Sequence, residues 1–102
     1  MINYDELEEL KANTYYHGTS DILCIDSLLP SNKTGNIREQ ELRKVYITTN
    51  YGSAMRYAYK ACDKFGGNPV VYKVIPDYDT LAHRIDSEYI CDYATIIEKA
   101  VL

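Results

Sequence analysis

The sequence predicts an α+β fold, because its strand-like and helix-like segments do not alternate strictly along the chain. The strongest strand signal lies at residues 70–75 (VVYKVI), which are rich in β-branched residues. The strongest helix signal lies at residues 51–63. Asn50 precedes this segment as a capping residue, and Ala54 and Ala58 share one face of the expected helix. Shorter β-prone runs follow one another without an intervening helix. A doubly wound parallel sheet is therefore not expected.

The N-terminal part of the chain is expected to hold two short helices and one strand. Residues 3–13 begin with the spacing of a capping box, which predicts a short helix. Residues 14–17 (TYYH) are β-prone and predict a strand. A second short helix is expected over residues 22–28, and the proline that follows prevents its continuation. The polar residues 31–43 are expected to form a long loop, which is also our candidate for recognising an acceptor.

The C-terminal part is expected to hold one helix and four strands, separated by turns. Glycine, asparagine and proline between residues 66 and 69 predict one turn, and a second turn is expected after Pro76. The expected strands cover residues 45–48, 70–75, 87–91 and 96–101, and the helix covers residues 51–63.

Length and charge limit what this protein can be. A chain of 102 residues has room for a single domain, which we expect to span residues 1–102. Eleven basic and 15 acidic residues leave a net charge of −4. This balance disfavours general binding to nucleic acid, because neutralising phosphates requires a surplus of Lys and Arg. Eleven tyrosines and no tryptophan predict a tyrosine-lined surface or pocket, or a core rich in β-structure.

The sequence lacks the patterns of a signal peptide, a membrane span, a disulfide framework or a zinc site. The first ten residues are acidic and lack the apolar centre of a signal peptide. No apolar run approaches the roughly 20 residues that span a bilayer. The three cysteines are far apart and form no Cys-x-x-Cys pair, which argues against a disulfide framework and against structural zinc. We therefore expect a cytoplasmic protein with no membrane partner and no metal.

The first candidate position for chemistry is His17, at the end of the expected strand over residues 14–17. Gly18 and Thr19 follow it, and a glycine lets a ligand approach the backbone closely. Taken alone, this fragment is more typical of a turn with a hydrogen-bonded histidine.

The second candidate position combines Tyr46, on an expected strand, with Tyr57, on the helix that follows. A strand, a turn and a helix in this order can bring both rings to one cleft. Two phenol rings would then clamp a flat cationic ring, because each ring face attracts positive charge. Taken alone, two core tyrosines are the better interpretation.

The third candidate position is Glu88, within the β-prone run Ser-Glu-Tyr-Ile-Cys. Strand alternation predicts that Glu88 and Ile90 share one face, with Tyr89 and Cys91 on the other. An acid in this place is either an exposed residue of an edge strand or a placed catalytic group. For a single strand, the edge interpretation is the more common.

Taken together and in order, the three fragments resemble a known family. The segments YYHGTSDILCIDSLLPS, KVYITTNYGSAMRYA and DSEYICDYATIIEKAVL resemble the three motifs of ADP-ribosyltransferases of the His-Tyr-Glu class, the diphtheria-toxin and poly-ADP-ribose-polymerase type. The resemblance covers residues 14–101. It implies a fold of split β-sheets, mixed or antiparallel, with a few short flanking helices.

The resemblance also implies NAD as a co-substrate. His17 would hold ribose hydroxyls, the Gly18 backbone would pair with the nicotinamide carboxamide, and Glu88 would hydrogen-bond the 2′-hydroxyl of the nicotinamide ribose. The two tyrosines would enclose the nicotinamide ring. The phosphates would need cations, for which Arg38, Arg43 and Lys44 are the candidates. The implied catalytic residues are His17, Tyr46 and Glu88, and the implied NAD-binding residues are His17, Gly18, Thr19, Arg38, Tyr46, Ser53 and Tyr57.

The chain departs from the family pattern in its second motif. Ala54 occupies the position that usually supplies a serine hydroxyl to the carboxamide, and Ser53 lies one residue before it. Either Ser53 takes over this role or the hydrogen bond is missing.

The resemblance leads to the expectation of a mono-ADP-ribosyltransferase that modifies a macromolecule, preferably a protein. Its small size suits a toxin, an effector or a phage-encoded inhibitor such as an anti-CRISPR protein. Three alternatives remain open. They are an inactive NAD- or protein-binding module on the same fold, an RNA 2′-phosphotransferase, against which the charge of −4 counts, and an α+β domain whose tyrosines are core residues.

Overall fold

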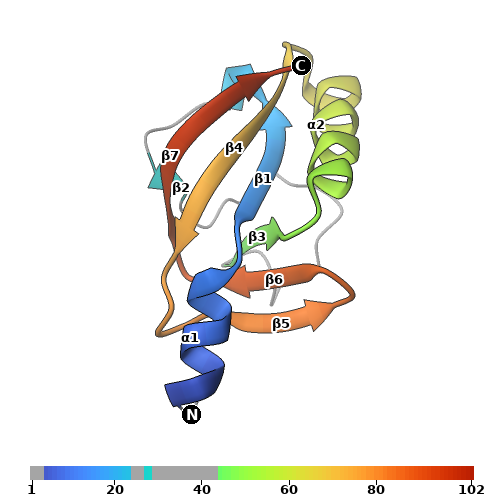
Figure 1. The fold of residues 1–102 in the computed structure, drawn as a ribbon. Helices are drawn as coiled ribbons and strands as arrows, with labels where there is room; N and C mark the ends of the chain where they lie inside the picture. Colours follow the sequence, from blue (N-terminus) through green and yellow to red (C-terminus); the bar gives the residue numbers. More distant parts are fainter. Residues whose placement is uncertain (1–3, 24–26, 29–43) are drawn as a thin grey trace.

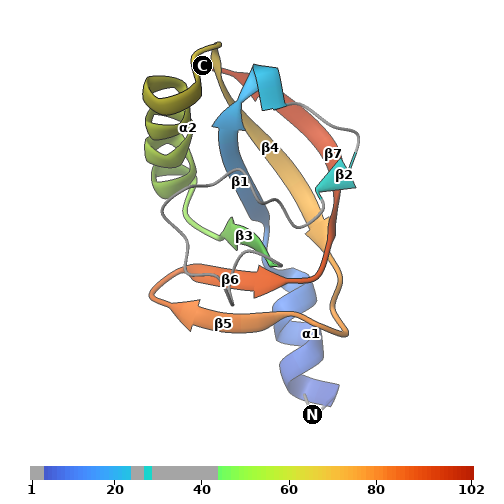
Figure 2. The same ribbon diagram turned by 180° about the vertical axis from the view of Figure 1, so that it is seen from behind.

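The computed structural model describes residues 4–23, 27–28 and 44–102, and within them it shows an α+β arrangement (Figures 1 and 2). The strands form a sheet in the order β2-β7-β4-β1-β3-β6-β5, and every neighbouring pair is antiparallel. The α+β prediction is thus confirmed. The elements are α1 (Tyr4–Ala12), β1 (Tyr15–Ser20), a 3₁₀ turn (Asp21–Leu23), β2 (Ser27–Leu28), β3 (Val45–Thr48), α2 (Tyr51–Phe65), β4 (Pro69–Pro76), β5 (Ala82–Ile85), β6 (Glu88–Cys91) and β7 (Ala94–Val101).

The sheet narrows at the junction between β1 and β3. Strand β1 pairs with β4 along its full length, whereas its register with β3 consists of Tyr16 opposite Thr48. Beyond this junction, β3, β6 and β5 run across the direction of β1, β4 and β7 (Figure 1). The described strands therefore belong to one hydrogen-bonded sheet, which is narrowest at this junction.

Helix α2 lies very close to the sheet because the contacting residues are small. Asn50 caps the helix as predicted, and its side-chain oxygen accepts a hydrogen bond from the Ser53 N–H at 3.0 Å. Ala54 and Ala58 are fully buried against β1 and β4. A Cβ atom added to Gly18 would lie 1.7 Å from the Ala54 carbonyl oxygen, so the helix and β1 are as close as glycine permits.

The opposite face of the sheet carries the larger core cluster. Tyr15 and Tyr72 are its largest fully buried side chains. Leu10 of α1 packs against this cluster, and its carbonyl oxygen accepts a hydrogen bond from the Tyr15 hydroxyl at 2.9 Å. Two of the eleven tyrosines are therefore core residues, which accounts for part of the tyrosine excess.

Two elements differ from the sequence-based expectation. The helix expected over residues 22–28 is wrong at its end, because Ser27 and Leu28 form β2 and pair with β7. Strand β5 was not expected, because all of its residues are exposed and show no alternation. Both strands lie at the edges of the sheet, where pairing with a neighbour decides the structure more than local propensity does. The expected loop over 31–43 lies outside the described residues.

The helices in the described segments are too short, or too polar, to pass through a lipid bilayer.

Candidate active site

The carboxylate of Glu88 contacts side chains from two other elements. Glu88 is the first residue of β6, and its side chain is 18% exposed. The Tyr57 hydroxyl of α2 donates a hydrogen bond to its Oε1 atom, and Nη1 of Arg84 in β5 lies 3.6 Å from its Oε2 atom. Because β6 lies between β3 and β5, the interpretation of Glu88 as an exposed edge residue is wrong.

Strand alternation places Glu88 on the face that α2 covers. Glu88 lies opposite Thr48, and Ile90 lies opposite Tyr46, in the ladder between β6 and β3. Cys91 is buried in the core cluster of the other face, and Tyr89 packs against the same cluster. The predicted division of this strand into two faces is therefore confirmed, and it directs the carboxylate toward Tyr57.

The two tyrosines of the second motif are linked through Arg84 and Glu88. The guanidinium carbon of Arg84 lies 5.3 Å from the centroid of the Tyr46 ring, while the same guanidinium approaches the Glu88 carboxylate. Tyr57 contacts that carboxylate from the side of α2. The structure thus brings Tyr46, Tyr57 and Glu88, which lie far apart in the sequence, into one chain of contacts, which we call the Glu88 cluster (Tyr46, Tyr57, Arg84 and Glu88).

His17 contacts the backbone of Tyr46, whereas Gly18, the next residue of β1, is the one that faces α2. The Nδ1 atom of His17 lies 2.7 Å from the Tyr46 carbonyl oxygen. Because a carbonyl oxygen only accepts hydrogen bonds, Nδ1 must carry the hydrogen. Desolvation lowers the pKa of His17, against the smaller raising effect of this hydrogen bond. The imidazole is therefore neutral near pH 7, and its Nε2 atom is left as an acceptor for a hydroxyl group.

His17 lies at the narrow junction in the sheet. If the register of Tyr16 with Thr48 continued, Gly18 would lie opposite Tyr46. The described strands instead have no such pair, and the Tyr46 carbonyl oxygen contacts the His17 ring. A side chain therefore bridges the two strands at the point where the backbone ladder ends.

Gly18 and Thr19, which follow His17 in β1, are both packed against other parts of the protein. Gly18 faces α2, so its lack of a side chain serves the contact with the Ala54 carbonyl group. Thr19, which the resemblance implies as an NAD-binding residue, is buried, with 7% of its surface exposed. The structure leaves the Gly18 backbone beside the junction of β1 and β3, next to His17.

The departure at Ala54 has a structural cause. Ala54 is fully buried against Gly18, so this position faces the sheet. Ser53 precedes Tyr57 by four residues and therefore lies on the same side of α2 as Tyr57. Its hydroxyl oxygen accepts a hydrogen bond from Arg56 Nη2 at 3.0 Å. Ser53 is thus the helix hydroxyl on the side of the Glu88 cluster.

Sequence reasoning missed Arg84. The register between β5 and β6 shifts between His83 and Ile85, so Arg84 is the extra residue of a β-bulge. No local sequence pattern marks this bulge. Of the three cations proposed for the phosphates, Arg38 and Arg43 lie outside the described residues, and Lys44 forms an exposed ion pair with Asp92 at 2.5 Å.

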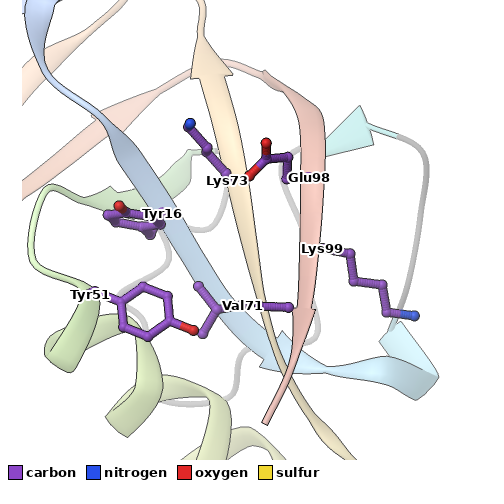
Figure 3. A pocket seen from close by; sticks show the side chains of 7 residues that line it. Tyr16, Tyr51, Val71, Lys73, Glu98 and Lys99 are labelled. Atoms are coloured by element: carbon purple, nitrogen blue, oxygen red, sulfur yellow. The ribbon is translucent and has the colours of Figure 1, made fainter.

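A hollow of about 260 Å³ lies on the other side of α2 and shares no residue with the predicted site (Figure 3). Tyr16 and Tyr51 meet edge to face at its border, with ring centroids 5.2 Å apart. The hollow is lined by Tyr16, Tyr51, Val71, Lys73, Glu98, Lys99 and Ala100.

Within the described ranges, no group of three or more His, Cys, Asp or Glu residues could hold a metal ion.

The Tyr57–Glu88 contact predicts a measurable titration. Burial, and secondarily the Glu88 hydrogen bond and charge, raise the pKa of Tyr57 to about 12. The Glu88→Gln variant should lower this pKa toward the ordinary value near 10, without reaching it, because desolvation remains. The Tyr57 ring signals in a nuclear magnetic resonance titration would report this change. An unchanged pKa in the variant would show that the two groups are not in contact in solution.

No protein-family model matches the sequence, and a search of curated proteins finds no match either.

Proposed function

We propose that this protein is a NAD-dependent mono-ADP-ribosyltransferase. One observation carries the proposal: in the Glu88 cluster, a carboxylate contacts one tyrosine, and a planar cation that approaches the same carboxylate covers the ring of a second tyrosine. The nicotinamide ring of NAD is also a planar cation. Aromatic faces and a nearby carboxylate are the groups that attract such a ring.

The proposed reaction breaks the bond between C1′ of the ribose and the nicotinamide nitrogen. The bonding electrons go to the ring, which leaves as neutral nicotinamide, and positive charge develops on the ribose. Glu88 would stabilise this charge and accept a hydrogen bond from the 2′-hydroxyl, much as a carboxylate does in glycoside hydrolysis. A nucleophile of the acceptor then attacks C1′ and loses a proton to solvent.

His17 supports this assignment through its protonation state. Its Nδ1–H is engaged by the Tyr46 carbonyl oxygen, and its lowered pKa keeps the ring neutral. The Nε2 atom can therefore accept a hydrogen bond from a ribose hydroxyl. Because the first motif pairs His17 with the backbone of Tyr46, it orients the imidazole before any substrate binds.

The acceptor that we propose is a macromolecule, preferably a protein, modified inside a cell by a toxin, an effector or a phage-encoded inhibitor. The net charge of −4 disfavours the RNA 2′-phosphotransferase alternative.

The proposal is tested by incubating the protein with a cell lysate and NAD labelled in its adenylate phosphate. We expect label in the protein fraction and an equal release of nicotinamide. Tyr46→Leu should weaken NAD binding about tenfold with little loss of stability, because one face of the ring site is lost. Tyr59→Leu is the matched control, since Tyr59 is an exposed tyrosine of α2 outside the Glu88 cluster.

Two results would replace this proposal with an alternative. NAD binding without nicotinamide release would indicate an inactive binding module. Unfolding of Tyr46→Leu, together with absence of NAD binding to the wild type, would indicate that the tyrosines serve the core.

A further inference from the structure

The guanidinium group of Arg84 lies where the proposed function places the nicotinamide ring. Its carbon atom is 5.3 Å from the centroid of the Tyr46 ring, and its Nη1 atom is 3.6 Å from Glu88 Oε2. These two contacts place the guanidinium on the side of the Tyr46 ring that faces Glu88. A guanidinium is planar, permanently charged and suited to stacking on an aromatic face. It therefore satisfies the same two groups that would attract a cationic nicotinamide ring.

The backbone of β5 supports a special role for this side chain. Arg84 is the bulged residue between His83 and Ile85, and bulges near functional sites re-aim side chains. Strand β5 forms one edge of the sheet, and all four of its residues are exposed. The arginine side chain is 38% exposed, so it can leave the Tyr46 ring without disturbing the core.

We propose that Arg84 is an internal occupant of the nicotinamide site, which a planar cationic ligand must displace. This inference rests on the proposed function. Arg84 competes with the ligand for the Tyr46 ring and for the Glu88 carboxylate. The apparent affinity of the site is then reduced by the fraction of molecules in which the ring is open. Arg84 thus determines how readily the site admits NAD.

The experiment uses N1-methylnicotinamide, a planar cation that lacks phosphates and ribose. Its binding to the wild type and to Arg84→Gln is measured by nuclear magnetic resonance of the Tyr46 and Tyr57 rings. We expect Arg84→Gln to bind the probe about three- to tenfold more tightly, because the competing cation is gone. In the wild type, the probe should also move the Arg84 side-chain signals away from their ring-shifted positions.

The control is Arg56→Gln, which removes the same charge from α2. Arg56 is close enough to lower the pKa of Tyr57, yet its guanidinium group donates a hydrogen bond to the Ser53 hydroxyl of its own helix. If removing positive charge were sufficient, both variants would bind the probe more tightly by the same factor. That equality would overturn the assignment of Arg84 as an occupant.

The remaining outcomes separate this inference from the proposed function. If the wild type binds the probe at the tyrosine rings and Arg84→Gln binds it equally or less tightly, the role of Arg84 is wrong and the proposed function stands. If neither protein binds the probe or NAD at these rings, both proposals are wrong.

Discussion

The Glu88→Gln variant is expected to lose nicotinamide release from NAD by a factor of about 10² to 10⁴. The variant keeps the size of the side chain, and its amide oxygen can still accept the hydrogen bond from Tyr57. It removes the negative charge that would stabilise the positive ribose in the transition state. Release of nicotinamide from NAD, measured with and without an acceptor, is the direct readout.

The matched control for this prediction is Glu98→Gln. Glu98 is a carboxylate of β7 that borders the hollow on the other side of α2, away from the Glu88 cluster. The Glu98→Gln variant changes the net charge by the same amount as Glu88→Gln, and we expect its activity to be within about twofold of the wild type. Equal activity of Glu88→Gln and the wild type would show that Glu88 is not the catalytic carboxylate. Circular dichroism would show that both variants are folded.

The Gly18→Ala variant is expected to lose about 3 kcal/mol or more of unfolding free energy. The added Cβ atom would lie 1.7 Å from the carbonyl oxygen of Ala54 and 2.6 Å from its carbonyl carbon. These are backbone atoms, so the contact is relieved only if α2 moves away from β1. Denaturation by urea would give the change in unfolding free energy.

The control for the glycine prediction is Gly52→Ala, in the first turn of α2. A Cβ atom there would lie 3.2 Å from Asn50 Oδ1, the end of a side chain that can shift slightly. We expect its stability to remain within about 1 kcal/mol of the wild type, because alanine also favours the helix. Similar stabilities of the two variants would contradict the close packing of α2 on β1.

Local patterns in the sequence predicted the elements whose residues carry regular periodicity. Strand β3 and helix α2 begin where expected, because Val45 begins a β-prone run and Asn50 supplies a cap. Strand β5 could not be predicted, since its four residues are all exposed and lie at an edge. For β2, pairing with β7 outweighed the helical tendency of Ser27 and Leu28.

The candidate site also combines residues that the sequence indicated with one that only the structure revealed. The resemblance singled out His17, Tyr46, Tyr57 and Glu88. The structure links Tyr57 to Glu88 directly and Tyr46 to Glu88 through Arg84, and it places the His17 ring against the backbone of Tyr46. Their roles in binding NAD remain predictions. Arg84 could not be found from the sequence, because only the bulge in β5 directs it to the same carboxylate.

The sequence by itself determined the fold class, the two faces of β6 and the cap of α2, because each depends on neighbours within a few residues. Only the tertiary structure decided that Gly18 contacts Ala54, that the His17 ring contacts the Tyr46 backbone where the pairing of β1 with β3 ends, and that Arg84 covers Tyr46. Each of these contacts joins residues that are far apart in the chain. Their geometry follows from strand register and helix packing, which no single segment of the sequence encodes.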